Sequence, residues 1–159
     1  MIAGFALLIL AATPVRADLS SAESKAVKAL IDSQAKEDST RQGRAREFVG
    51  GRRFARGDLD ADRKDELVVL FTLERGNVWS QFLGVLGLGS TPLARKRVGK
   101  KGERKVELAG TMNGSIEPAT GTYGGADALC CPSIRGHSWF VLRGTVLEED
   151  NADTIVVKH

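Results

Sequence analysis

Residues 66–89 read ELVVLFTLERGNVWSQFLGVLGLG, and this stretch decides the fold. Residues 67–73 are rich in branched apolar side chains at odd and even positions alike, which is typical of a strand that is covered on both faces. Arg75-Gly76-Asn77 supplies a turn, and the apolar run that starts at residue 78 predicts a returning partner strand. We therefore expect this hairpin at the centre of a sheet.

Further hairpin patterns follow along the chain. Asn113-Gly114 is the strongest turn signal, because a two-residue hairpin turn needs residues that tolerate a positive φ. Residues 99–102 and 143–145 also have the composition of turns. The strands predicted around these turns span residues 93–98, 104–112, 138–142 and 146–149, with a final edge strand at 154–158.

One helix precedes the strands. Ser20 and Glu23 have the spacing of a capping box, in which each side chain binds a free main-chain amide of the first turn. Behind them, apolar residues recur on one helical face until the pattern ends near residues 36–39. These residues are Ala22, Ala26, Val27, Leu30 and Ile31. The sequence thus predicts an α+β fold, with one N-terminal amphipathic helix packed on an antiparallel β-meander.

Composition limits the class of protein. The 159 residues include 23 basic and 20 acidic side chains, a net charge of +3, which excludes a strongly acidic or a polybasic chain. The 42% of hydrophobic residues supports a single folded domain over residues 18–159. The chain lacks G-x-S-x-G, H-E-x-x-H, P-loop and Rossmann signatures, so we expect no catalytic activity. A hydrolase that uses two distant carboxylates stays open.

Residues 1–17, MIAGFALLILAATPVRA, predict an export signal peptide. An apolar run from residue 2 to 12 is followed by Pro14 and by Val15 and Ala17 at the −3 and −1 positions of a cleavage site. An uncleaved anchor or a buried core segment is the alternative. No later stretch has eighteen consecutive apolar residues, so we expect a periplasmic or secreted protein without stable membrane insertion of the mature chain.

Residues 57–67 read GDLDADRKDEL and predict a metal loop. Calcium takes six to eight oxygen ligands, and acids at alternate positions of a tight loop converge on one point. The spacing does not fit an EF-hand, because position twelve of that motif falls on Val69 within the predicted strand. The expected ligands are Asp58, Asp60, Asp62, the carbonyl of Lys64, and Glu66. An empty, solvated acidic turn is the alternative.

This loop resembles the calcium loops of FG-GAP-type repeats, whose pattern is D-x-[DN]-x-D-G-x-x-[DE] followed by an apolar strand. The resemblance covers about a dozen residues in one copy, so it implies a calcium loop and no propeller. Arg63 stands where that pattern has glycine, and it places a positive charge beside the proposed ion.

Cys130 and Cys131 are adjacent and precede Pro132. Because export exposes them to an oxidising compartment, a vicinal disulfide is the first expectation; two buried thiols or a cross-link to another chain are alternatives. A nucleophilic Cys131 with His137 and Asp127, or a zinc site on both cysteines and His137, is a weaker interpretation.

Residues 50–149 resemble a group of small exported bacterial envelope proteins. In these, a GD-x-[DN]-x-D loop and strand precede a Y-x-x-x-D-x-x-CCPS segment, here residues 123–133, and a hairpin that ends L-x-E, here Leu147 and Glu149. The CCPS segment is similar to that of LppP/LprE-type lipoproteins, although this chain has no lipid-acceptor cysteine near residue 17. The resemblance implies the compartment and the fold rather than an activity.

Seven basic residues lie between positions 95 and 105, with one acid among them. They are candidates for binding an anionic polymer such as a lipid or glycan, and a hairpin tip that charge keeps soluble is the alternative. Nucleic acid is not expected, because aromatic residues do not interleave. The candidates are Arg95, Lys96, Arg97, Lys100, Lys101, Arg104 and Lys105.

Taken together, the residues predict an exported, calcium-stabilised binding domain without catalytic activity. Its partner would be an envelope protein or an anionic polymer. A thiol-dependent redox or sensor protein that uses Cys130 and Cys131 is the alternative from a different class, and an inhibitor of a cell-wall enzyme is a further one.

Overall fold

A computed structural model describes residues 18–39 and 43–150. The predicted signal peptide and the predicted edge strand at 154–158 lie outside these residues. The described chain forms one α-helix, α1 (Ser21–Asp38), two short 3₁₀ helices, η1 (Val49–Gly51) and η2 (Leu88–Ser90), and ten strands in one antiparallel sheet. This confirms the α+β class. None of the helices in the described residues has the length and apolar character that crossing a membrane requires.

The helix begins where the capping box predicts. The Glu23 N–H donates to Ser20 Oγ at 3.2 Å, and the Ser20 N–H donates to Glu23 Oε2 at 2.8 Å. The main-chain hydrogen bond from Ser20 and a side-chain hydrogen bond from the Arg56 guanidinium hold the pKa of Glu23 below its usual value. The cap therefore fixes the first turn and ties it to the following strand region through Arg56.

The strands follow one another mostly in chain order. The neighbour sequence is β1-β3-β4-β5-β6-β7-β9-β10; β2 also pairs with β3, and β8 also pairs with β7. Their bounds are β1 (Arg46–Glu47), β2 (Arg53–Gly57), β3 (Glu66–Arg75), β4 (Val78–Leu86), β5 (Pro92–Lys100), β6 (Arg104–Met112), β7 (Ser115–Thr122), β8 (Ile134–His137), β9 (Trp139–Arg143) and β10 (Val146–Asp150).

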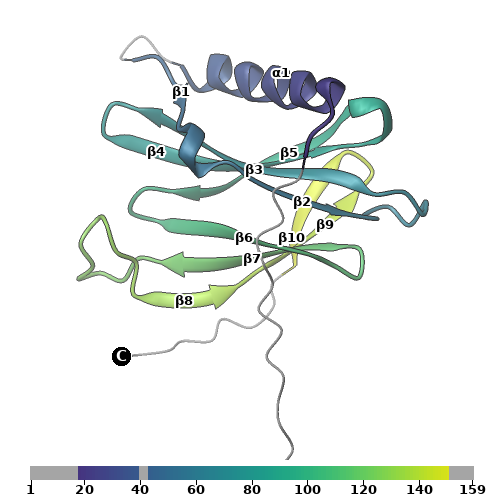
Figure 1. The fold of residues 1–159 in the computed structure, drawn as a ribbon. Coiled ribbons are helices and arrows are strands. Elements are labelled where there is room, and N and C mark those ends of the chain that lie inside the picture. Colours follow the sequence, from purple (N-terminus) through teal and green to yellow (C-terminus); the bar gives the residue numbers. More distant parts are fainter. Residues whose placement is uncertain (1–17, 40–42, 151–159) are drawn as a thin grey trace, which may run out of the picture.

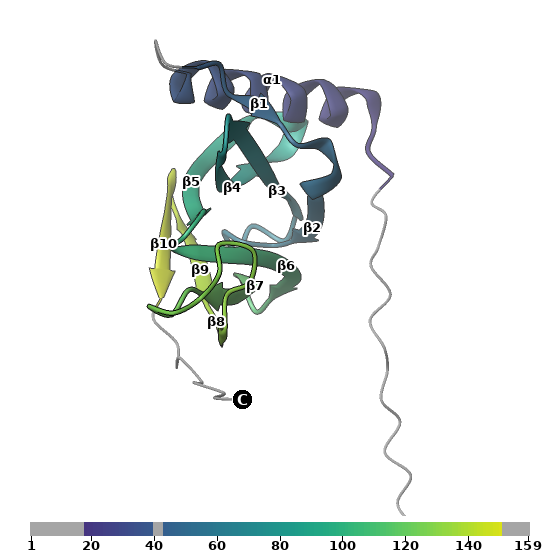
Figure 2. The ribbon, with the colours of Figure 1, turned by 90° about the vertical axis from the view of Figure 1, so that its left-hand side faces the viewer.

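The sheet divides between β5 and β6. These two strands pair only at Lys100 and Arg104, beside their turn, and then separate. As a result β1–β5 and β6–β10 form two halves that face each other, with α1 on the outer face of the first half (Figures 1 and 2). The molecule thus has three layers: helix, first half-sheet and second half-sheet.

Each face of β3 covers a different core, which explains its continuous apolar pattern. Leu67, Val69 and Phe71 pack with the helix, where Phe71 and Phe82 stack with ring centroids 5.4 Å apart. Val68 and Leu70 belong to the inner core between the halves. The inner core also contains Leu59, Leu83, Val85, Ala94, Val98, Val106, Ile116, Phe140, Leu142 and Leu147.

The predicted turns are confirmed. Asn113 and Gly114 have φ angles of 51° and 76°, and they join β6 to β7 where Met112 pairs with Ser115. Gly76, with φ of 59°, lies in the turn of the central hairpin. The strand β8 (Ile134–His137) was not predicted from the sequence, because its four residues contain a glycine, two polar residues and only one apolar residue.

Candidate metal centre

The acidic loop joins β2 to β3. Leu59, within the loop, is only 4% exposed and belongs to the inner core. Thr111 Oγ1, from the tip of the second half-sheet, donates to the Arg56 carbonyl at 2.5 Å, just before the loop. The loop is thus anchored by its own apolar residue and by a strand from the opposite half of the sheet.

Three carboxylates converge in this loop. One oxygen from each of Asp58, Asp60 and Glu66 lies within 4.8 Å of the other two, and Glu66 is 2% exposed. The Leu59 N–H donates to Glu66 Oε2 at 2.7 Å, and the Arg63 N–H donates to Asp58 Oδ2 at 3.0 Å. The other oxygen of Asp58, Oδ1, is shielded from solvent and has no hydrogen-bond partner among the described residues.

The electrostatics of the cluster oppose ionisation. Desolvation raises the pKa of Glu66 above its usual value, and the charges of Asp60, Asp62 and Asp58 raise it further, although the Leu59 amide opposes this. Uncompensated carboxylates at this spacing repel by several kcal/mol at an effective dielectric of about 20. A divalent cation would remove that repulsion and would also satisfy Asp58 Oδ1.

The other predicted ligand residues, Asp62 and Lys64, contact each other within the loop. Asp62 Oδ1 accepts the Lys64 N–H at 2.9 Å, and Asp62 Oδ2 lies 3.7 Å from Lys64 Nζ. Asp60 Oδ1 accepts the Asp62 N–H at 3.1 Å. Asp62 is not a member of the converging group. Each of the three converging carboxylates offers one oxygen to the cluster, so at least three further oxygens would be needed for calcium coordination.

Two non-glycine residues of the loop have left-handed backbone conformations, Ala61 with φ of 64° and Arg63 with φ of 68°. Position 63 is where the FG-GAP pattern has glycine. We expect Arg63→Gly to raise the free energy of unfolding by about 0.5–1 kcal/mol, since it removes a strain of roughly 1–2 kcal/mol and adds flexibility to the unfolded chain. Urea unfolding measures this change.

Lys64→Gly is the matched control, because Lys64 is not among the residues with a positive φ. It should lower the free energy of unfolding by about 0.5–1 kcal/mol. Equal effects of the two substitutions would contradict the argument from backbone conformation.

The CCPS segment forms an ordered loop between β7 and β8. A disulfide joins Cys130 to Cys131, and both residues are exposed. The carboxylate of Asp127 closes the loop by accepting the N–H groups of Gly124 and Ser133 at 2.7 and 2.8 Å. These main-chain hydrogen bonds lower the pKa of Asp127.

This geometry opposes the weaker interpretations of the cysteines. The carboxylate of Asp127 binds main-chain amides, and His137 Nδ1 lies 4.0 Å from Glu117 Oε1. The contacts of Asp127 and His137 are therefore with groups other than Cys131, which opposes a catalytic triad of these three residues. Within the ranges that the structure describes, the acidic cluster is the only group of three or more metal-binding side chains, so the two cysteines and His137 form no zinc site.

Six of the seven basic residues between positions 95 and 105 bind acceptors within the chain. Arg95 pairs with Glu37 at 2.8 Å, and Lys101 Nζ donates to the Asn77 carbonyl at 2.6 Å. The other four that are engaged are Lys96, Lys100, Arg104 and Lys105. Arg97 is exposed. Most of this positive charge is therefore balanced locally.

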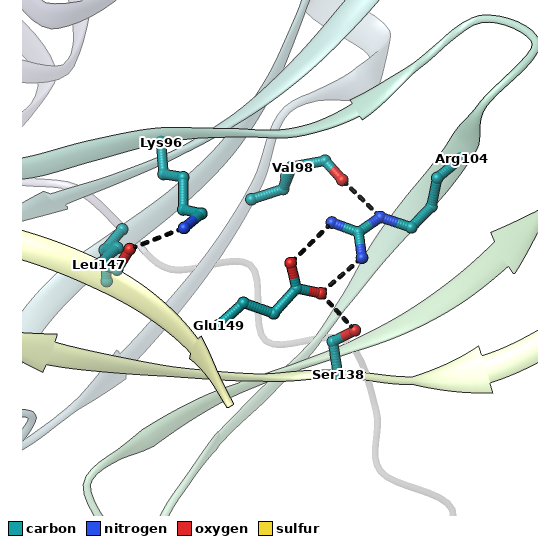
Figure 3. Close-up of polar contacts among 6 residues, drawn as sticks. All are labelled: Lys96, Val98, Arg104, Ser138, Leu147 and Glu149. Atoms are coloured by element: carbon teal, nitrogen blue, oxygen red, sulfur yellow. Dashed lines mark hydrogen bonds and ion pairs between the residues drawn. The ribbon is translucent and has the colours of Figure 1, made fainter. Parts of the chain in front are cut away.

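The most extensive of these contacts links β6 to β10 within the second half-sheet and reaches β5 of the first half through the Val98 carbonyl (Figure 3). The Arg104 guanidinium donates to both oxygens of Glu149, at 2.5 and 3.2 Å, and to the Val98 carbonyl at 2.8 Å. Ser138 Oγ also donates to Glu149, at 2.8 Å. Lys96 Nζ reaches across to the Leu147 carbonyl at 3.1 Å. The basic cluster thus has a structural role that its composition did not reveal.

Comparison with protein-family models, with curated proteins and with solved structures finds no match for this chain. The function is therefore argued from the geometry of the chain itself.

Proposed function

We propose that this chain is an exported binding domain, without catalytic activity, in which a calcium ion fixes the loop between β2 and β3. The observation that carries the proposal is the buried Asp58 Oδ1, which lacks a partner while two other carboxylates stand beside it. A buried carboxylate oxygen normally has a hydrogen bond or a cation.

Calcium suits this loop better than magnesium. Its ligands are oxygens only, and the loop has an irregular backbone with two left-handed residues. Calcium tolerates irregular coordination by six to eight oxygens, whereas magnesium demands a near-ideal octahedron and keeps several waters. Asp62, the carbonyl of Lys64 and water would complete the shell in this proposal.

The location of the ion also suggests its role. The loop touches the inner core through Leu59 and the second half-sheet through Thr111, while Arg56 beside it pairs with Glu23 of the helix at 2.7 Å. An ion in the loop would therefore stabilise the contact among all three layers. The run β3–β7 would serve as a meander framework, and the partner would be an envelope protein rather than an anionic polymer, given the local balance of the basic residues.

The test is thermal unfolding of the mature domain in about 10 mM calcium and in chelator. With a dissociation constant of about 10⁻⁴–10⁻³ M, as in extracellular modules, calcium would stabilise the fold by about 1.4–2.7 kcal/mol. This corresponds to a rise of roughly 5–10 °C in Tm. The same concentration of magnesium should give a smaller shift.

Asp58→Asn should abolish the calcium response, because it removes a charge and one ligand oxygen. Asp65→Asn is the matched control, since Asp65 is an exposed acid of the same loop outside the converging group, and it should keep the response. Isothermal titration that shows no heat, together with an unchanged Tm, would remove calcium from the proposal.

A thiol-dependent redox or sensor function is the second candidate. The exposure of both cysteines supports it, because a dithiol reductant could reach either sulfur. Mass measurement after alkylation, with and without reductant, distinguishes the candidates: reversible reduction at the potential of the compartment favours the sensor, and an inert pair favours a structural disulfide.

A further inference from the structure

A groove opens where the two halves of the sheet separate. Its volume is about 460 Å³, within the usual range of ligand sites. Leu70, Val106 and Leu108 line it from both halves, and Phe48 and Trp79 supply aromatic rings. Phe48 is 50% exposed, which is unusual for a large aromatic side chain. Of the residues that line the groove, only Lys105 was a candidate site residue in the sequence.

A side-chain amide already pairs with the main chain along one wall of the groove. Gln81, in β4, is 7% exposed. Its Oε1 accepts the Val106 N–H at 2.7 Å, and its Nε2 donates to the Val106 carbonyl at 2.9 Å. These are the two hydrogen bonds that a neighbouring strand would supply. The edge of β6 therefore binds an amide group at this position.

The main-chain N–H and carbonyl of Leu108, two residues further along β6, face the same way as those of Val106. Leu108 pairs with Pro118 of β7. Pro118 has no N–H, and its carbonyl accepts the Ser138 N–H at 3.2 Å, on the side away from β6. Opposite residues in an antiparallel pair either exchange both hydrogen bonds or direct both groups outward. The N–H and carbonyl of Leu108 thus point away from β7, as those of Val106 do.

Among the described residues, no side chain bonds to the main chain of Leu108 as Gln81 does to that of Val106. In the ranges 18–39 and 43–150, no strand other than β5 pairs with this edge of β6, and β5 does so only at Arg104. β2 runs beside the far end of β6, where Thr111 contacts the Arg56 carbonyl, but it is not paired with β6 as a strand. Leu108 therefore presents a main-chain donor and acceptor in the wall of an apolar groove.

The rim of the groove carries one charge of each sign that is not paired within the described chain. Arg53 donates only to the carbonyls of Gly50 and Arg52, and Glu74 is exposed and has no ion pair. Lys105 and Glu107 lie 3.4 Å apart and balance each other. The rim is thus complementary to a segment that carries both an acidic and a basic side chain.

We propose that this groove binds a short extended peptide segment of a partner protein, which pairs with β6 at Leu108 and places an apolar side chain between Phe48 and Trp79. The mode is addition of a strand at a sheet edge, in which main-chain hydrogen bonds give affinity and a side-chain pocket gives selectivity. The inference rests on the proposed function as a binding domain and names its binding surface. It does not depend on the calcium ion.

Nuclear magnetic resonance titration of the ¹⁵N-labelled mature domain tests the proposal. The probes are the peptides Ac-Glu-Val-Phe-Val-Lys-NH₂ and Ac-Lys-Val-Phe-Val-Glu-NH₂, because the strand can enter in either direction. One of them should shift the amide signals of Leu108, Gly51 and Trp79 and should slow hydrogen exchange at Leu108. The same peptide with N-methyl groups at its Phe and following Val should bind at least about tenfold more weakly, since it cannot donate to the edge.

Trp79→Ala should weaken binding about tenfold by removing one aromatic wall. Leu88→Ala is the matched control, because Leu88 is 57% exposed and lies outside the groove. Equal binding of the N-methylated peptide, unchanged Leu108 signals at millimolar peptide, or slow exchange of the Leu108 amide without peptide would each overturn the proposal.

The titration is run in calcium and in chelator, so that the two proposals fail separately. If calcium raises Tm but neither peptide binds, the groove proposal fails and the calcium proposal stands. If a peptide binds equally well in both buffers and calcium leaves Tm unchanged, the groove proposal stands without the ion.

Discussion

Replacing Gln81 with methionine should lower the free energy of unfolding by about 2–4 kcal/mol, because the substitution leaves the N–H and the carbonyl of Val106 without partners. Val106 is 1% exposed, so water cannot replace the lost bonds without opening the fold. Methionine has nearly the size of glutamine, so little of this loss would come from a cavity. Urea unfolding monitored by circular dichroism measures the change.

Gln34→Met is the matched control for this prediction. Gln34 is also a buried glutamine, 8% exposed, but it lies on the helix and the structure gives its side chain no hydrogen bond. We expect a change below about 1 kcal/mol there. A loss of similar size at both positions would show that burial rather than the pairing with Val106 explains the effect. Hydrogen exchange at the Val106 amide should accelerate only in Gln81→Met.

Glu149→Ala should lower the free energy of unfolding by about 2–3 kcal/mol. The substitution removes two hydrogen bonds from Arg104 and one from Ser138, and it leaves a largely covered guanidinium without its carboxylate. The side chains of Arg104 and Glu149 are 26% and 23% exposed, so solvent screens the pair only in part. Thermal unfolding at neutral pH measures the loss.

Glu148→Ala supplies the control from the next residue of the same strand. Glu148 pairs with Arg143 at 2.7 Å, but these side chains are 57% and 65% exposed. Exposed ion pairs contribute at most about 1 kcal/mol, so the substitution should have little effect. Comparable losses at Glu148 and Glu149 would contradict a special role for the Arg104–Glu149 pair, which links β6 to β10.

The contribution of Glu149 should also depend on pH. Burial alone would raise its pKa, but the hydrogen bonds from Arg104 and Ser138 outweigh burial and lower the pKa below its usual value of 4.5. A carboxyl group whose pKa is lowered by folding stabilises the fold above its unfolded pKa, and this stability is lost as pH falls through the folded value. The stability difference between the natural chain and Glu149→Ala should therefore shrink below about pH 4.5. A difference that stayed constant down to pH 2 would contradict the assigned cause.

Contacts between the two half-sheets lie beside both proposed sites, the calcium loop and the peptide groove. The calcium loop is anchored at one contact between the half-sheets, through Thr111, and the peptide groove lies beside another, through Gln81. Arg104 joins the halves at a third contact, where its guanidinium donates to the Val98 carbonyl of β5. If the proposals hold, variants that separate the halves should weaken peptide binding as well as stability.

Much of the fold was predictable because its signals are local. The capping box of Ser20 and Glu23 involves residues three apart, and the turn at Asn113-Gly114 depends on the conformations of those two residues. The apolar pattern of residues 67–73 predicted a strand covered on both faces, and β3 packs against the helix on one face and the inner core on the other. The strand β8 was missed because four residues with a glycine carry too weak a pattern.

The acidic loop was predictable in composition but not in geometry. Alternate acids indicated a cluster, yet Asp62 turns to the amide of Lys64, and Asp58, Asp60 and Glu66 converge without it. Ala61 and Arg63, on either side of Asp62, have left-handed backbone conformations. Residue spacing alone does not encode those angles when the residues are not glycine.

Local sequence patterns were sufficient to predict the helix, the central hairpin, the main turns and the acidic loop, because each pattern depends on residues close together in the chain. The contacts of Gln81 with Val106, 25 residues away, and of Arg104 with Glu149, 45 residues away, depend instead on how the strands pack in space. The Gln81 contact arises because β5 and β6 separate beyond their turn, so the main-chain groups of Val106 that a paired strand would satisfy need another partner. The groove at Leu108 is the position along that edge where no strand of the described chain supplies one.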